Sequence, residues 1–513
     1  MKSLFKTVAI ITVFSVLTRA LGFFFRIFLG RTLGAELLGV YQVAFSVFAV
    51  LLTVVSSGIP LVVSKLTAKY STEKSKEKEH SMVTAALIIG LVLSVVLCGV
   101  VLAFNWLFNM IFTDERCILI LITLLPSVIF SSIYCAFRGS LWGHDRYFSV
   151  CLAELFEQVA RILICVLMVT GLFGAVDGAI SAAASLSIAC VLSAIFVAVQ
   201  YFYFGGRLKK PKGQIKEVLK SSTPITGVRL ASSLITPIIA IIVPMRLVAA
   251  GFTEGQAMSQ FGVAMGMTLP LLFIPMAVIG SLSMALIPDL SAATAQGNDS
   301  HIEGRIKSSL VFTILVSMLF VPLFMGAGEL MGQFFYDNAF SGTLLVSAAW
   351  IMIPMGLTNI TSSILNALGL EIKSLRNYVV GALFLLGASW FLPAVVGISA
   401  LVYGMGLCSI ATTILNIRMI AKKTKTKIKI VKPLVTLSLI ALPVMAITSF
   451  VSNLLTHVFP LFVNLAISCV LGAGLYILLA VVFKVIDIAV YYTQFKEKLA
   501  KKKKKKAKPA NNS

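Results

Sequence analysis

The sequence predicts an all-α protein that crosses a membrane many times. Of its 513 residues, 58% are hydrophobic and only 12% are charged, and the mean hydropathy is +0.99. A soluble domain carries about 25% charged residues. Apolar runs of about 20 residues, the length that a helix needs to cross the hydrocarbon core, recur along the whole chain. They lack the period-two alternation over about 10 residues that marks the strands of a membrane β-barrel.

Fourteen apolar segments meet this description, and we predict one transmembrane helix for each. Lys2 and Lys6 precede the first as they would in a signal peptide, but no small-residue cleavage site follows its long core, so we expect an uncleaved helix. The predicted spans are 7–29, 38–64, 82–105, 118–138, 150–171, 177–204, 222–248, 260–288, 308–328, 343–368, 377–393, 397–420, 434–454 and 461–483.

Lysine and arginine cluster in alternate loops. With the N-terminus inside, all but seven of the 43 fall on inside segments. Basic residues accumulate on the cytoplasmic side, so both termini should be cytoplasmic. The predicted outside loops are short, and the longest covers 329–342. We expect no extramembrane domain, which places any activity within the membrane.

The first span carries Arg19 and Arg26, and the seventh carries Arg229 in its inner half. Arg19 and Arg26 are seven residues apart, two turns along one helix face. Each charge costs about 2.5–3.5 kcal/mol at the bilayer centre. Arg19, Arg26 and Arg229 have no nearby acidic residue in the sequence. An unpaired cationic cavity suits an anion, and the guanidinium fork matches phosphate oxygens. Snorkelling to the interface or local structural pairing is the alternative.

The fifth span carries a polar stripe. Glu154, Glu157, Gln158 and Arg161 follow the i, i+3, i+4, i+7 spacing of one helix face. Glu157 and Arg161 are predicted to form an i, i+4 ion pair. Two interpretations stay open: a structural ion pair, or a cavity wall that binds a coupling cation or proton at Glu157.

Spans seven and eight echo spans one and two. "TPITGVRLASSLI" is similar to "VFSVLTRALGF", and "SMALIPDLSAATA" to "SSGIPLVVSKLTA". If this is no chance likeness between apolar helices, the halves are parallel repeats, and such transporters bind substrate between the halves near the midplane. The predicted division is an N-terminal lobe, a C-terminal lobe, an extra helix pair and a polybasic cytoplasmic tail: 1–221, 222–432, 433–484 and 485–513.

Prolines concentrate in the same two spans. Proline removes a backbone donor and bends a helix, so we predict bent gate helices there. The alternative is the general abundance of proline in membrane helices. The predicted gate or hinge residues are Pro224, Pro237, Pro244, Pro270 and Pro275, with Pro288 at the end of span eight.

The remaining polar features predict no catalytic or metal site. The tail "KEKLAKKKKKKAKPANNS" should bind anionic membrane lipid rather than nucleic acid, because it is tethered at the membrane. The eight cysteines form no C-x-x-C pair and are expected to be small buried hydrophobes. The four histidines lack metal-ligand spacing. We expect no metal and no cofactor.

Several segments together carry a family resemblance: "TRALGFFFRIFLGRTLGAELLGVYQVAF", "GIPLVVSKLTAKY", "FRGSLWGHDRYF", "AELFEQVARI" and "LPLLFIPMAVIGSLSMALIPDLSAA". With the fourteen-span count, they resemble the polysaccharide-exporter branch of the multidrug/oligosaccharidyl-lipid/polysaccharide (MOP) superfamily. Within it the match is to the stage V sporulation protein B type, which is related to the lipid II flippases. The resemblance covers about residues 5–430.

The resemblance implies a MATE-like fold of two lobes with alternating access and a central cationic cavity. The implied substrate is a polyprenyl-pyrophosphate-linked oligosaccharide, moved to the outer leaflet of the bacterial plasma membrane for wall or capsule assembly. Arg19 and Arg26 occupy the matching positions for first-helix arginines, and Arg229 is carried over from its place in span seven. The analogous pair of the lipid II flippases is one residue closer, which favours the sporulation branch. Spans thirteen and fourteen match the extra pair that forms a lipid-tail groove.

On this reading Arg19, Arg26 and Arg229 bind pyrophosphate and no enzymatic step is expected. Gln42, Asn359 and Asn366 are candidates for sugar selectivity. Transport against a gradient needs coupling to H⁺, Na⁺ or the membrane potential. We expect a monomer and leave wall-synthesis proteins open as partners. The alternatives are a cation-coupled multidrug antiporter, which would want an acidic cavity, and a membrane glycan-assembly enzyme or structural partner.

Overall fold

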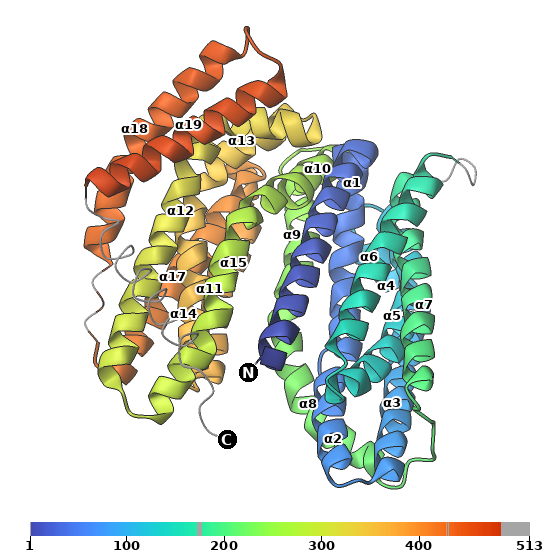
Figure 1. Ribbon diagram of the computed structural model, residues 1–513. Helices are drawn as coiled ribbons and strands as arrows, with labels where there is room; N and C mark the ends of the chain where they lie inside the picture. The colour runs from blue at the N-terminus through green and yellow to red at the C-terminus, as the bar shows by residue number, and fades with distance from the viewer. Residues whose placement is uncertain (1, 172–176, 427, 429, 484–513) are drawn as a thin grey trace. The chain divides into compact units, whose positions relative to one another are not determined.

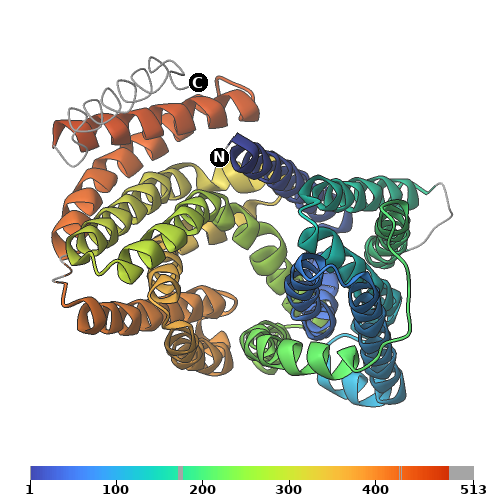
Figure 2. The same ribbon diagram turned by 60° about the horizontal axis from the view of Figure 1, so that its bottom comes forward.

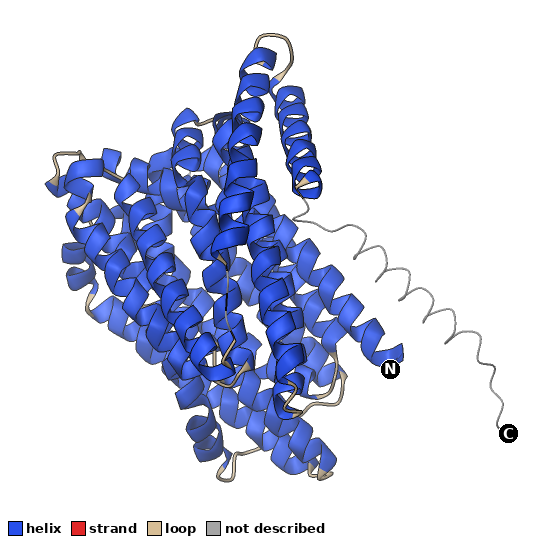
Figure 3. Cartoon of the chain, turned by 90° about the vertical axis from the view of Figure 1, so that its left-hand side faces the viewer, coloured by secondary structure: helices blue, strands red, loops and turns tan. Residues whose placement is uncertain are grey.

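The computed structural model describes residues 2–171, 177–426, 428 and 430–483. In this part of the chain every regular element is a helix and no strand is present (Figure 3). The predicted lysine-rich tail lies outside the described residues. The elements, in chain order, are α1 (Lys2–Ser56), α2 (Ile59–Thr72), α3 (Lys76–Ala103), α4 (Asn105–Ile111), α5 (Arg116–Gly143), α6 (Tyr147–Val169), α7 (Gly178–Tyr203), α8 (Gln214–Ser233), α9 (Ile235–Ala249), α10 (Glu254–Gly262), the π-helix η1 (Val263–Thr268), α11 (Leu269–Ala295), α12 (Asp299–Tyr336), α13 (Ala339–Ala348), the 3₁₀-helix η2 (Ala349–Ile351), α14 (Met352–Ala367), α15 (Glu371–Phe391), α16 (Pro393–Val396), α17 (Ser399–Thr424), α18 (Val431–Leu455) and α19 (Leu461–Val482).

Helix lies over every predicted span, and eleven stretches of the described chain are long and apolar enough to cross a membrane. One of the eleven is Ile10–Thr72, which joins α1 and α2. α6, with its three charged residues, and α15 are not among the eleven. The chain is therefore a helical, polytopic protein with eleven candidate spans.

The predicted spans 7–29 and 38–64 meet at a kink inside α1. Gly34 has φ 71° and ψ 176°, a backbone conformation that glycine adopts without steric cost. The second span is not the continuous helix that we predicted, because α1 ends at Ser56 and α2 then runs on to Thr72. Pro60 occupies the first turn of α2, where its missing N–H leaves no carbonyl unpaired.

Prolines disrupt the seventh and eighth predicted spans. Pro237 cannot donate a hydrogen bond to the carbonyl of Ser233, and α8 ends at that residue. α10 passes into α11 through the π-helical η1, which comes just before Pro270. Pro270 lacks the N–H that would bond to the Gly266 carbonyl, and such irregular turns accommodate the loss. Four more prolines lie inside helices: Pro224 in α8, Pro244 in α9, and Pro275 and Pro288 in α11. Their role in gating stays a prediction.

The predicted outside loop 329–342 is almost entirely helical. α12 extends to Tyr336 and α13 begins at Ala339, so only Asp337 and Asn338 separate them. Asn338 makes this short turn possible because its side-chain oxygen accepts the Ser341 N–H at 2.8 Å, as an N-cap does.

The helices group into two compact units, each with its own apolar core. The first comprises the described residues of Met1–Leu271 together with Phe335–Leu344 and Leu375–Ala411, and the second comprises Leu272–Phe334, Leu345–Ser374 and the described residues from Thr412 to 483. In the first unit α5, α6 and α7 lie side by side (Figures 1 and 2). In the second, α18 packs along α19 (Figure 1). The predicted lobe boundary at residue 221 stays a prediction.

Small residues bring α5 against α2. A Cβ on Gly139 would lie 2.9 Å from the carbonyl oxygen of Pro60, and one on Gly143 would lie 2.7 Å from that of Ser64. Glycines one turn apart allow helix backbones in a membrane to approach this closely. This contact positions Arg138, which precedes Gly139, and His144, which follows Gly143.

The end of α5 is joined to the start of α3 by an ion pair. Nε2 of His144, just after α5, lies 3.0 Å from Oε1 of Glu79, and its Nδ1 lies 2.9 Å from the Ser140 carbonyl oxygen. The hydrogen bond to Glu79 raises the pKa of His144 above its ordinary 6.5, against an opposing effect of burial. Both ring nitrogens have acceptors, so the imidazolium is the favoured form.

We expect this pair to make stability depend on pH. Because the folded-state pKa of His144 is raised, its contribution is fully present below about pH 6.5 and is lost as the pH rises through the folded pKa. Thermal unfolding of the purified protein should be compared between wild type and His144→Gln from pH 5.5 to 8.5. The difference in Tm should shrink with rising pH. A pH-independent difference would contradict the ion pair.

Candidate functional site

Seven arginines lie outside the predicted inside segments, and four of them have partners in the structure. Arg31 Nε donates to the Phe335 carbonyl at 2.8 Å, and Arg246 Nε donates to the Trp390 carbonyl at 2.8 Å. Arg116 pairs with Glu36 and Asp114, and Arg161 donates to Gln158 Oε1 at 2.7 Å. These four arginines are held in place by the protein itself.

The other three are Arg19, Arg26 and Arg229, the predicted pyrophosphate ligands. All three side chains are exposed, and none forms an ion pair or a side-chain hydrogen bond with any described residue. Arg19 and Arg26 lie on α1 and Arg229 lies on α8, two helices that pack against each other. The three arginines therefore lie on two helices of the first unit, and their joint role as an anion site stays a prediction.

The candidates for sugar selectivity are distributed over both units. Gln42 is half-buried on α1 in the first unit. Asn359 and Asn366 are exposed on α14 in the second, and Asn359 Oδ1 accepts the Ser283 hydroxyl at 2.9 Å. Their role in selectivity stays a prediction.

The polar stripe of α6 lies among α1, α5 and α7. Glu154 pairs with Arg138 of α5 at 2.5 Å, and the Arg138 guanidinium lies 4.2 Å from the centroid of the Trp142 ring. We had counted Arg138 with an inside loop, but it lies within α5. The four-residue spacing of Tyr134, Arg138 and Trp142 on one helix face is the signal that could have revealed it.

Glu157 and Arg161 do not form the ion pair that we predicted. Glu157 Oε2 accepts the Ser193 hydroxyl of α7 at 3.1 Å, whereas the Arg161 guanidinium lies 5.0 Å from the Phe25 ring centroid of α1. Helical spacing puts the two side chains on one face of α6. The rotamer of each is set instead by its contact with a neighbouring helix, α7 for Glu157 and α1 for Arg161. The stripe therefore links three helices and leaves one carboxylate bound only through a hydroxyl.

Three donors in the stripe and in its partner Arg138 of α5 have no partner among the described residues. They are the Nε atoms of Arg138 and Arg161 and Nε2 of Gln158, all buried. An unmet buried donor costs about 1–3 kcal/mol.

The Arg138–Glu154 pair gives a stability prediction. Because the pair is partly buried, removing one partner should cost about 1–3 kcal/mol, between the values for exposed and buried pairs. We expect Glu154→Gln and Arg138→Met each to lower the Tm, and the double variant to lose less than the sum. The control is Glu303→Gln, which breaks the exposed Glu303–Lys307 pair and should cost only about 0.3–0.5 kcal/mol. Additive effects at residues 138 and 154 would contradict the pairing.

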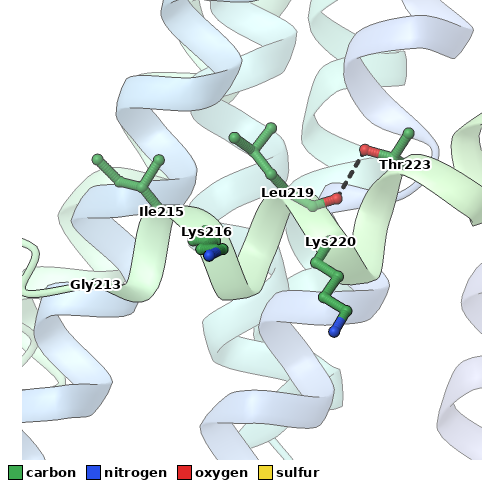
Figure 4. Close-up of a pocket in the computed structure, with 6 residues that line it drawn as sticks. All are labelled: Gly213, Ile215, Lys216, Leu219, Lys220 and Thr223. Atoms are coloured by element: carbon green, nitrogen blue, oxygen red, sulfur yellow. Dashed lines mark hydrogen bonds between the residues drawn. The ribbon is translucent and has the colours of Figure 1, made fainter.

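A basic hollow follows the first turns of α8. It has a volume of about 670 Å³ and is lined by Gly213, Ile215, Lys216, Leu219, Lys220 and Thr223 (Figure 4). Gly213 has φ 91°, which turns the chain into the helix, and the Thr223 hydroxyl donates to the Leu219 carbonyl at 2.7 Å. Lys216 and Lys220 are one turn apart and give the hollow two positive charges. We had counted these lysines only as topology signals.

Comparison with known proteins gives one family and two sequence relatives. A profile of the family described as polysaccharide biosynthesis protein matches residues 4–294. Stage V sporulation protein B of Bacillus subtilis (strain 168) is 26% identical over 495 residues, which cover 92% of this chain and 93% of that protein. Sporulation protein YkvU of the same strain is 26% identical over 229 residues, or 42% of this chain and 50% of that protein.

Solved structures share the fold. The lipid II flippase MurJ, in an inward closed conformation, matches with a TM-score of 0.68 at 16% identity, covering 92% of this chain and 98% of that one. A multidrug resistance MATE family transporter of the MOP superfamily, in an inward-facing conformation, also matches with a TM-score of 0.68, at 17% identity over 80% of this chain and 95% of that one. The architecture is therefore that of MurJ and the MATE transporters.

Proposed function

The chain is a multi-pass membrane protein of the polysaccharide biosynthesis protein family, and from that premise we propose that it is a flippase. Its substrate is a polyprenyl-pyrophosphate-linked oligosaccharide, a lipid II-like or other wall or capsule precursor. The protein moves this lipid from the inner to the outer leaflet of a bacterial plasma membrane by alternating access, without an enzymatic step. The relatives named for sporulation and for lipid II flipping support this substrate class.

One observation carries the proposal. Of seven arginines in the spans or on the outer side, only Arg19, Arg26 and Arg229 have no partner among the described residues. An arginine in a span costs about 2.5–3.5 kcal/mol on insertion scales. A diphosphate would neutralise this charge through bidentate hydrogen bonds. Chemically different substrates, such as cationic drugs, would be repelled.

The path that we propose keeps the two ends of the substrate apart. The headgroup enters the cationic cavity, while the polyprenyl tail stays in lipid, since exposing it to water would cost about 0.8 kcal/mol per CH₂. We propose fourteen crossings, with two in Ile10–Thr72 and one each in α6 and α15 in addition to the other candidate spans. The lobes are parallel repeats, and both termini are cytoplasmic. The extra helix pair, α18 and α19, lies beside the polyprenyl tail of the substrate during transport.

Coupling to an ion is assigned to the polar stripe of α6. Among the described residues Glu157 has only the Ser193 hydroxyl as a side-chain partner, and it lies near the unmet donors of Gln158 and Arg161. A carboxylate so placed can take up H⁺ or Na⁺ and change the hydrogen bonds that join α6 to α7. The membrane potential is the alternative driving force.

The test is reconstitution of the purified protein into vesicles with a fluorescent lipid-linked oligosaccharide in the inner leaflet. We expect the label to become accessible to an external reducing reagent only in vesicles that contain the protein. A parallel assay measures efflux of a cationic dye. Dye efflux without lipid movement would favour a drug antiporter, a change in the glycan itself would favour an enzyme, and no activity in either assay would favour a structural role.

A further inference from the structure

A second cavity lies in the first unit, at the end that the basic loops predict to be cytoplasmic. It has a volume of about 170 Å³ and lies between the first turn of α3, the end of α5 and the end of α7. The helix α1 and the arginines on it contribute nothing to its wall. Part of the motif "FRGSLWGHDRYF" forms one side of it, and the proposed transport path does not use that part.

Positive charge dominates the wall of this cavity. Lys76 and Arg146 line it, and neither has an acidic partner within 4 Å among the described residues. The Arg146 guanidinium stacks over the Phe204 ring at 3.5 Å, which fixes its plane. Glu79 is the one carboxylate in the wall, and the His144 ring, 3.0 Å away, balances its charge. The cavity therefore has a net positive charge.

Two neutral groups in the wall offer further donors. His80 Nδ1 accepts the backbone N–H of Arg207 at 3.3 Å, so the proton of the neutral ring is on Nε2. Ser140 is only 1% exposed, and its hydroxyl oxygen has no hydrogen-bond partner among the described residues. Leaving such a buried hydroxyl unmet costs about 1–3 kcal/mol. A ligand oxygen in the cavity would satisfy it.

We propose that this cavity binds one phosphate group, held by Lys76, Arg146 and the Ser140 hydroxyl. The size fits, because an engineered cavity of about 150 Å³ in another protein accommodates benzene, which has more heavy atoms than phosphate. Free phosphate and the phosphate of an anionic lipid headgroup offer the same chemistry. The site is independent of the proposed flippase function and ties together the ends of α3, α5 and α7.

The test is thermal unfolding of the full chain in a phosphate-free neutral detergent at pH 7. Sodium phosphate is titrated against sodium chloride at equal ionic strength. We expect a saturable rise of Tm with phosphate only, and an increase of at least tenfold in the half-saturating concentration for Lys76→Gln and Arg146→Gln. The matched control is Lys78→Gln, an exposed lysine of the first turn of α3 that does not line the cavity; it should leave the titration unchanged.

Ser140→Ala distinguishes binding from a general loss of stability. Without phosphate its Tm should equal or exceed that of wild type, because the unmet hydroxyl is gone, yet its half-saturating phosphate concentration should rise. Phosphatidylglycerol added to the micelles shows whether the bound phosphate group belongs to a lipid. If the lipid is the ligand, it raises Tm and abolishes the effect of free phosphate. If free phosphate is the ligand, the rise of Tm with sodium phosphate persists in the presence of the lipid. No saturable effect of either compound, or equal effects in wild type and all three cavity variants, would overturn the proposal.

Discussion

Replacing Arg19 or Arg229 by glutamine is expected to slow lipid flipping at least tenfold while membrane insertion and Tm stay close to those of wild type. Neither side chain contacts an acidic group of the described protein, so its removal breaks no ion pair. Each loss removes charge-assisted hydrogen bonds to the substrate, worth about 1.5–3 kcal/mol. This corresponds to at least a tenfold fall in initial flipping rate. The double variant Arg19→Gln, Arg229→Gln should show a larger fall.

Arg31→Gln is the matched control, because it removes a guanidinium from the same helix. Arg31 is held by the Phe335 carbonyl, so this variant should lose some stability and keep its flipping rate per folded protein. Arg19→Lys should retain part of the activity, since lysine keeps the charge but not the planar fork. Normal flipping by Arg19→Gln, or an equal loss in Arg31→Gln, would remove these arginines from the mechanism.

The helices could be predicted because hydropathy is a local property. Each apolar run is hydrophobic enough by itself to favour insertion into the bilayer, and helix lies over all of the predicted spans. The ends of the helices depend on single residues that hydropathy ignores. The N-cap of Asn338 converts a predicted loop into a two-residue turn, and the conformation of Gly34 divides α1.

Side-chain partners were harder to predict because they come from other helices. Sequence spacing suggested Glu157 as the partner of Arg161, but Ser193 of α7 and Phe25 of α1 compete for the two side chains. Arg138 looked like a loop residue, and its ion pair with Glu154 depends on α5 lying against α6. Arg19, Arg26 and Arg229 were singled out by the lack of nearby acids in the sequence, a property that the fold did not change.

The largest loss of stability is expected from adding one methyl group where α1 crosses α10. A Cβ on Gly262 would overlap the carbonyl oxygen of Ala35, and a Cβ on Gly39 would overlap that of Met258. Both obstacles are backbone atoms, which cannot rotate away as a side chain can. Overpacking typically costs about 1–3 kcal/mol, so we expect Gly262→Ala and Gly39→Ala each to lie at or above the upper end of this range.

The test is the Tm and the monodispersity of the purified variants in detergent. Gly99→Ala in α3 is the control, because nothing lies within 4 Å of its Cβ, and alanine favours the helix there. The double variant should lose little more than either single variant, since the first methyl group already separates the helices. The two glycines lie in the predicted second and eighth spans. The backbone at each glycine packs against a carbonyl oxygen of the other's helix. Wild-type stability in Gly262→Ala would therefore contradict the close backbone crossing of α1 and α10.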